Sequence, residues 1–237
     1  MEQATGANRL QRLIARLQSP SAWRSLVLSP VLPFAALSLL LLWWHEPWRD
    51  EAQAWLIVRD TTSFAQLRHV LAYEGTPALW HALLWPLAKL GLPFLAARVL
   101  AAAAATACVA ILWKHAPFPN WARWLLCFGY FLAYEYDAIA RSYVLGFLFL
   151  LLLAACDRLR FERPGLYALL LAGLANTSFH GLLLAAVLGG AHLVEVVRRK
   201  EFGRNTWVAA AVAAAGLVLA ASQMRPPADG ARSSTEG

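Results

Sequence analysis

Acidic residues follow long apolar segments directly in two separate parts of the chain. One apolar run ends in the stretch WWHEPWRDEAQAW, where the tryptophans are followed within a few positions by Asp50 and Glu51. Glu135 and Asp137 come at the end of a later run and precede Arg141. A carboxylate can take a proton from an attacking hydroxyl or amine, and a guanidinium can hold a phosphate leaving group. These residue types therefore suit group transfer from a phosphate-bearing donor at a membrane surface.

The composition is typical of a membrane protein with several spans. The chain has 237 residues, of which 59% are hydrophobic, and its mean hydropathy is +0.50. The net charge is +7, but the basic residues lie in short segments between apolar runs. Membrane topology explains this pattern better than nucleic-acid binding does. We expect a multi-pass protein of the inner (plasma) membrane with membrane lipids as neighbours and no nucleic-acid partner.

Hydropathy predicts an all-α fold with about seven transmembrane helices. A span needs roughly 20 mainly apolar residues. The predicted spans cover about 25–44, 98–114, 121–136, 142–156, 165–179, 181–197 and 206–223. A further apolar run at 77–97 is interrupted by prolines, His81 and Lys89, and we expect it to stay outside the membrane.

The positions of the basic residues predict the orientation, because cytoplasmic loops of membrane proteins are rich in Lys and Arg. If 77–97 does not cross, thirteen basic residues fall on the cytoplasmic side, in 1–24, 114–123, 157–163 and 198–204. If it crosses, nine of them move to the outer side. The first topology is favoured, and it places the N-terminus in the cytoplasm.

This topology divides the chain into three parts and gives it one long outer loop. The parts are a basic amphipathic cytoplasmic tail at 1–24, the transmembrane module at 25–223 and a polar outer tail, expected to be disordered, at 224–237. The outer loop covers 45–97. Ser63 and Gln66 have the spacing of a capping box there, which predicts short helices lying on the membrane surface.

The predicted topology also brings the chemically useful residues to one side of the membrane. The outer loop carries Asp50, Glu51 and Glu74, and the end of the third span carries Glu135 and Asp137. Arg141 and Tyr143 begin the fourth span, and His180 lies at the next outer turn.

The order of these elements resembles the GT-C superfamily of polyprenyl-phosphate-sugar-dependent glycosyltransferases, of the protein O-mannosyltransferase and lipid A aminoarabinose transferase type. Such enzymes have a first span and then an outer loop that opens with an acidic motif, here Asp50-Glu51 in WRDEAQAW. A later element similar to YE-x-x-P is YEGTP, which starts at Tyr73.

Two further elements match the same pattern. The second span begins with an arginine, Arg98, and the third span ends in acids near an AR-x-Y element within YEYDAIARSYVLG. The resemblance covers roughly residues 25–223 and rests on the order and common sidedness of these elements.

The resemblance implies sugar transfer from a polyprenyl-phosphate donor to a glycan, lipid or protein acceptor at the outer face. Asp50 would be the general base, and Arg141 would contact the donor phosphate. The implied catalytic residues are Asp50, Glu51, Glu135 and Asp137, and the implied substrate-binding residues are Glu74, Arg141, Tyr143 and His180. The choice between Glu135 and Asp137 as the second acid stays open. No metal ligand is assigned, although a divalent metal is compatible with the chemistry.

Several of these residues also have a purely structural explanation. Glu51 can be an exposed acid that the dipole of a first helical turn favours. Glu74 can be a plain turn residue, and His180 can pack with Asn176 at its outer turn. Arg141 can pair with Asp137, which lies four residues earlier.

Two other functions remain as alternatives to a glycosyltransferase. Members of the family usually continue with further spans and a second outer loop, and this chain stops where that loop would begin. We therefore weigh an inactive N-terminal fragment or a non-catalytic membrane subunit. A transporter fits less well, because the charges lie at the ends of spans and the sequence shows no internal repeat.

Overall fold

The computed structural model describes residues 29–225, and this part of the chain is all-helical, without a strand. Its helices are α3 (Val31–Trp44), α4 (Arg49–Asp60), α5 (Phe64–Glu74), α6 (Leu79–Lys89), α7 (Leu95–His115), α8 (Asn120–Cys127), the π-helix η1 (Phe131–Glu135), α9 (Tyr143–Ala155), α10 (Leu159–Glu162), α11 (Pro164–Ala175), α12 (Phe179–Arg199) and α13 (Arg204–Gln223). The predicted amphipathic tail at 1–24 and nearly all of the predicted outer tail lie outside the described residues.

Three helices are long and apolar enough to cross a membrane, which indicates a membrane protein. They are α7, α12 and α13, with 21, 21 and 20 residues. The helices α3, α9 and α11 are also apolar but shorter. These six helices coincide with six of the seven segments that hydropathy predicts as spans.

The seventh predicted span, at 121–136, is not one regular helix. The α-helix α8 ends at Cys127, and the chain resumes at Phe131 with a single π-helical turn. The backbone N–H of Tyr136 donates to the carbonyl of Phe131 at 2.8 Å, five residues earlier. Gly129, a poor helix former, lies in the break between the two pieces. Hydropathy reports the apolar character of this segment but not the interruption of its backbone.

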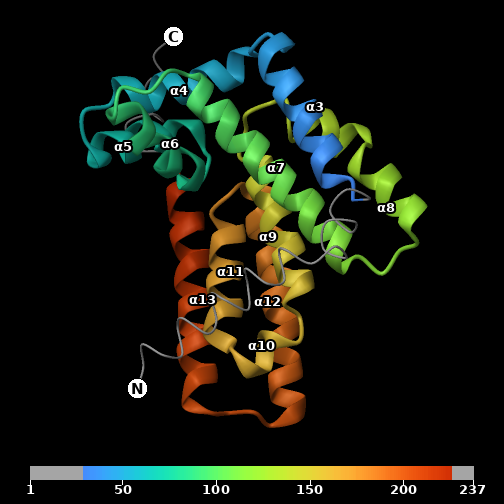
Figure 1. The fold of residues 1–237 in the computed structure, drawn as a ribbon. Coiled ribbons are helices and arrows are strands. Elements are labelled where there is room, and N and C mark those ends of the chain that lie inside the picture. The colour runs from blue at the N-terminus through green and yellow to red at the C-terminus, as the bar shows by residue number, and fades with distance from the viewer. Residues whose placement is uncertain (1–28, 226–237) are drawn as a thin grey trace, which may run out of the picture.

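The helices form an elongated bundle with a smaller group of helices at one end (Figure 1). In the bundle, α11 packs against α9, α12 and α13, and α9 also packs against α7, which in turn contacts α3. The short helices α4, α5 and α6, which we call the head, lie together at one end. The short α10 and the turn between α12 and α13 lie at the opposite end.

The head is built from the segment that the sequence predicts as a long loop with short helices. The predicted cap of α5 is present, because the Ser63 hydroxyl accepts a hydrogen bond from the Gln66 backbone N–H at 3.2 Å. The Gln66 side chain returns to the backbone N–H of Thr62 at 2.7 Å, one residue before the expected partner. At the other end of α5, Gly75 adopts a left-handed conformation, with a φ of 63°, and turns the chain toward α6.

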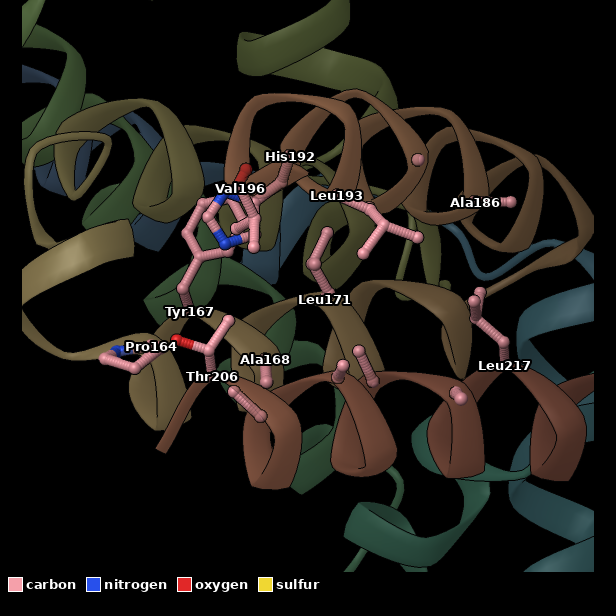
Figure 2. Close-up of a pocket in the computed structure, with 16 residues that line it drawn as sticks. Pro164, Tyr167, Ala168, Leu171, Ala186, His192, Leu193, Val196, Thr206 and Leu217 are labelled. Atoms are coloured by element: carbon pink, nitrogen blue, oxygen red, sulfur yellow. The ribbon is translucent and has the colours of Figure 1, made fainter. Parts of the chain in front are cut away.

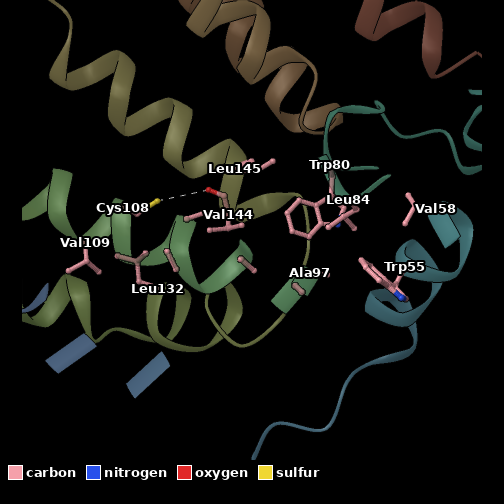
Figure 3. Close-up of a cluster of buried hydrophobic side chains, with 14 of the residues drawn as sticks. Trp55, Val58, Trp80, Leu84, Ala97, Cys108, Val109, Leu132, Val144 and Leu145 are labelled. Carbon is pink, nitrogen blue, oxygen red and sulfur yellow. Dashed lines mark hydrogen bonds between the residues drawn. The ribbon is translucent and has the colours of Figure 1, made fainter. Parts of the chain in front are cut away.

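A continuous apolar core joins the head to the bundle (Figure 3). Trp55 from α4 and Trp80 and Leu84 from α6 are buried together with Cys108 of α7 and Val144 of α9. The Cys108 thiol lies 4.0 Å from the Val144 carbonyl oxygen, where α7 and α9 are in contact. The helices that carry the head's polar residues are therefore held on a packed base.

Partly buried polar contacts also fix several helix ends. Arg98, at the start of α7, is buried and donates to the Leu41 carbonyl near the end of α3 at 2.9 Å. At the end of α13, the Gln223 side chain accepts from the Ala78 backbone N–H at 2.6 Å and donates to Asn176 at 3.3 Å. Gln223 thus ties the bundle to the start of α6.

Glycines allow the helices of the bundle to approach closely. A Cβ atom on Gly216 of α13 would overlap Ala172 of α11, whereas a Cβ atom on Gly190 of α12 would meet nothing within 4 Å. The contact between α11 and α13 therefore depends on Gly216.

We predict opposite effects for the same substitution at these two positions. Gly216→Ala should lower stability by about 1–3 kcal/mol through overpacking, despite the better helix propensity of alanine. Gly190→Ala should raise stability by about 0.5–1 kcal/mol, because only the propensity changes. Thermal unfolding of the detergent-solubilised protein measures both. Equal effects would contradict the close packing of α11 and α13.

Candidate active site

Three of the sequence-predicted site residues, from three separate segments, line one polar cavity between the head and the turn that precedes α9. Asp50 comes from the first turn of α4, Glu74 from the last turn of α5, and Arg141 from the turn that precedes α9. The cavity has a volume of about 280 Å³. Its polar lining residues include Asp50, Gln53, Glu74, His81, Arg141 and Ser142.

Arg141 pairs with Asp50 across this cavity. The distance from Arg141 Nη1 to Asp50 Oδ2 is 3.1 Å, and the two side chains are 35% and 55% exposed. The guanidinium also lies over the ring of Tyr143, 4.9 Å from its centroid. The alternative pairing of Arg141 with Asp137 is not formed, because residues 137–141 form a turn rather than helix. Arg141 is held from two sides and still reaches solvent.

Glu74 faces the pocket with its carboxylate already oriented. Gln53 of α4 donates from Nε2 to both Glu74 oxygens, at 2.9 and 3.0 Å. These hydrogen bonds join the end of α5 to the face of α4 that also carries Asp50. Glu74 is therefore more than a turn residue, since it contacts a side chain 21 positions earlier.

Glu51 lies behind the pocket and not in its lining. Its side chain is buried, with 1% of the residue exposed, so it is not the exposed first-turn acid of the structural alternative. One oxygen accepts from the Ala140 backbone N–H at 2.6 Å. The other accepts from the Trp48 backbone N–H at 2.7 Å and contacts His45 Nε2 at 3.2 Å. Glu51 thus joins the start of α4 to the turn that carries Arg141 and acts as a positioning residue.

Asp137 is also buried but lacks such partners. Only 2% of the residue is exposed, and neither carboxylate oxygen has a hydrogen-bond partner among the described residues. Burial raises the pKa of Asp137 to about 6, and the nearby Ser38 hydroxyl offsets only part of this effect. That hydroxyl donates to the Phe34 carbonyl at 3.0 Å. Asp137 does not line the cavity.

The remaining predicted site residues lie at or outside the edge of this arrangement. Tyr143 supports Arg141 through its ring. Glu135 accepts a hydrogen bond from the Tyr130 hydroxyl at 3.2 Å, away from the cavity. His180 is exposed at the start of α12 with its ring near Phe179, and it does not line the cavity either. The structure therefore places neither Glu135 nor Asp137 in the cavity that Asp50 lines.

His81 lines the cavity, although the sequence motifs do not single it out. It is 8% exposed in α6, and burial lowers the pKa of its imidazole from 6.5 to about 4. Its Nδ1 is enclosed without a hydrogen-bond partner in the described part of the chain. The sequence feature that could have drawn attention to His81 is its place as a lone histidine inside the apolar run 77–97, four residues after the YEGTP element.

The composition of the cavity limits the chemistry that it can perform. Within residues 29–225, no group of three His, Cys, Asp or Glu side chains is arranged to hold a metal ion. The cavity instead offers a solvent-accessible carboxylate, a guanidinium and a neutral imidazole. These groups can accept a proton, hold a phosphate and form uncharged hydrogen bonds.

A second cavity, of about 310 Å³, lies between α11, α12 and α13 (Figure 2). Side chains such as Leu171, Leu193 and Val196 line it, and it contains neither an acid nor an arginine. Its polar lining residues are Tyr167, His192 and Thr206, so it lacks the guanidinium and carboxylate that the polar cavity combines.

No known protein family, curated protein or solved structure matches this chain.

Replacing Glu51 by glutamine should destabilise the head. Both Glu51 oxygens accept hydrogen bonds from backbone N–H groups. In either orientation of the glutamine side-chain amide, one of these N–H donors would therefore face an NH₂ group. We expect Glu51→Gln to cost roughly 3 kcal/mol in the free energy of unfolding. The exposed Glu46 in the same segment is the matched control, and Glu46→Gln should stay within about 0.5 kcal/mol of wild type. Equal melting temperatures for both variants would contradict the bridging role of Glu51.

Asp137→Asn should stabilise the protein in a pH-dependent manner. The folded state favours the neutral acid, so wild-type stability is highest below pH 3.8 and falls as the pH rises through about 6. An uncharged asparagine removes this fall and should gain about 3 kcal/mol near pH 8 and little near pH 4. Glu135→Gln, at a partly exposed position, is the control. A pH-independent difference between wild type and Asp137→Asn would contradict the burial of a titrating carboxyl group.

Proposed function

We propose that the chain is a membrane glycosyltransferase of the GT-C type, which transfers a sugar from a polyprenyl-phosphate donor at the outer face of the plasma membrane. The observation that carries this proposal is the Asp50–Arg141 pair beside Glu74 in one accessible cavity. These residues come from segments that are far apart in the sequence. Each lies in one of the motifs on which the family resemblance rests: Asp50 in WRDEAQAW, Glu74 in YEGTP and Arg141 in the AR-x-Y element.

The arrangement of helix ends supports a topology of seven crossings. Following the chain in Figure 1, α3 runs toward the head, α7 runs away from it, and α8 with η1 returns. Then α9 leads away, α11 back, α12 away and α13 back to the head. In this topology α8 and η1 together form the third crossing, despite the break between them.

The distribution of charge supports the orientation. Basic residues lie at the ends of α7 and α12, in or next to α8 and α10, and at the start of α13. They are Lys114, Arg123, Arg158, Arg160, Arg163, Arg198, Arg199, Lys200 and Arg204. The positive-inside rule assigns these segments to the cytoplasm and hence the head to the outer side. A lipid-linked donor in the outer leaflet then presents its phosphate at the level of the head.

In the proposed reaction, Asp50 accepts the proton of the acceptor hydroxyl or amine. The freed electron pair of the acceptor forms a bond to the anomeric carbon of the sugar. The bond between that carbon and the phosphate oxygen breaks, and polyprenyl phosphate leaves with the bonding electrons. Arg141 stabilises the negative charge of this leaving group.

The ion pair explains how donor binding prepares the base. In the structure, the Asp50 carboxylate engages Arg141 at 3.1 Å. A donor phosphate competes for the same guanidinium, and a phosphate can make two parallel hydrogen bonds to it. When Arg141 turns to the phosphate, Asp50 is free to take the proton of the acceptor. Tyr143 keeps the guanidinium near the cavity during this exchange.

Asp50→Asn should abolish transfer and leave donor binding intact. Loss of a general base lowers turnover by at least about a hundredfold. The measurement is transfer of radiolabelled sugar from polyprenyl-phosphate donors into the lipid, glycan and protein fractions of membranes, which requires no knowledge of the acceptor. The control is Asp60→Asn, because Asp60 is an exposed aspartate at the other end of α4 that pairs with Arg59. Full activity of Asp50→Asn would contradict the proposed function.

A further inference from the structure

His81 is a polar residue of the proposed active site for which the reaction above gives no role. Its ring is almost completely buried in α6 and lines the same cavity as Asp50 and Arg141. Its Nδ1 is enclosed, and nothing in residues 29–225 forms a hydrogen bond with it. A buried polar atom without a partner costs folding free energy. An apolar side chain would avoid this cost at position 81, so the polarity of the ring points to a role for its other nitrogen, Nε2, in binding a ligand.

The surroundings of His81 determine what it can offer to such a ligand. Because burial lowers its pKa to about 4, the ring is neutral near pH 7 and carries a single N–H. Enclosed N–H groups without an acceptor are rarer in proteins than under-satisfied acceptors. The proton therefore resides on Nε2, and the enclosed Nδ1 keeps its lone pair. Nε2, the ring nitrogen that is not among the enclosed unpartnered atoms, is then an uncharged hydrogen-bond donor.

We propose that His81 positions the sugar of the lipid-linked donor by donating a hydrogen bond from Nε2 to a sugar hydroxyl. This inference rests on the proposed transferase function. Arg141 already serves the phosphate and Asp50 the proton of the acceptor, so the sugar is the part of the substrate that still needs a partner. An uncharged donor suits a hydroxyl group and does not compete with Arg141 for the phosphate.

Substitutions at position 81 should affect sugar binding and protein stability differently. A leucine at position 81 removes the hydrogen bond and also the unpartnered Nδ1, so the protein should melt at the same or a higher temperature. A glutamine carries an N–H donor at nearly the same distance from the backbone as Nε2, so it should restore most of the sugar recognition. A residue that only fills the core would show neither behaviour.

The experiment compares the binding of sugar-free and sugar-bearing lipids to the purified full-length protein. The probes are farnesyl phosphate and the farnesyl-phosphate esters of mannose and aminoarabinose, titrated in mild detergent. Wild type should bind farnesyl phosphate and at least one ester. His81→Leu should keep its affinity for farnesyl phosphate and lose about tenfold for that ester, the value of one hydrogen bond. His69→Leu, an exposed histidine of α5 that does not line the cavity, is the matched control and should bind both as wild type does.

Three outcomes would overturn the inference in distinguishable ways. If wild type binds none of the lipids, the proposed function fails and the role of His81 fails with it. If wild type binds an ester and His81→Leu binds it equally well, or if His81→Gln is as weak as His81→Leu, only the role of His81 fails. If His81→Leu melts early or also loses farnesyl phosphate, His81 is a structural residue.

Discussion

The buried carboxylate of Glu51 is the contact on which the candidate site depends. A carboxylate removed from water is costly unless hydrogen bonds replace its hydration. Here the backbone N–H groups of Trp48 and Ala140 and the ring of His45 surround it. The start of α4 and the turn before α9 can separate only if these hydrogen bonds break. Because Asp50 and Arg141 are each adjacent in sequence to one of these anchored positions, their pairing follows from the same constraint.

Two neighbouring acids therefore have different roles because their surroundings differ. Successive residues of a helix point about 100° apart, so Asp50 faces the cavity while Glu51 faces the turn. Asp50 is more than half exposed and can exchange partners, whereas every oxygen of Glu51 is occupied. The apolar core beneath α4 and α6 keeps this arrangement rigid, and Gln223 anchors the same region to the end of the bundle. A preformed site of this kind reduces the ordering that substrate binding requires.

The sequence was informative where a feature depends on composition or on order along the chain. Apolar runs predicted the positions of α7, α12 and α13, and motif order predicted that Asp50, Glu74 and Arg141 lie together. It was less informative where tertiary contacts decide. The break before η1, the burial of Asp137 and the partner of Arg141 depend on how distant helices pack. A lone histidine in an apolar run carries no sign of which cavity it lines, so the place of His81 required the structure.

We propose that Arg141 holds the phosphate of a lipid-linked sugar in the cavity beside Asp50. Mass spectrometry of the lipids that co-purify with the protein in mild detergent tests it most directly, with wild type compared with Arg141→Ala. We expect a polyprenyl-phosphate sugar that is enriched on wild type and absent from the variant. Only bulk phospholipid on both proteins would contradict it.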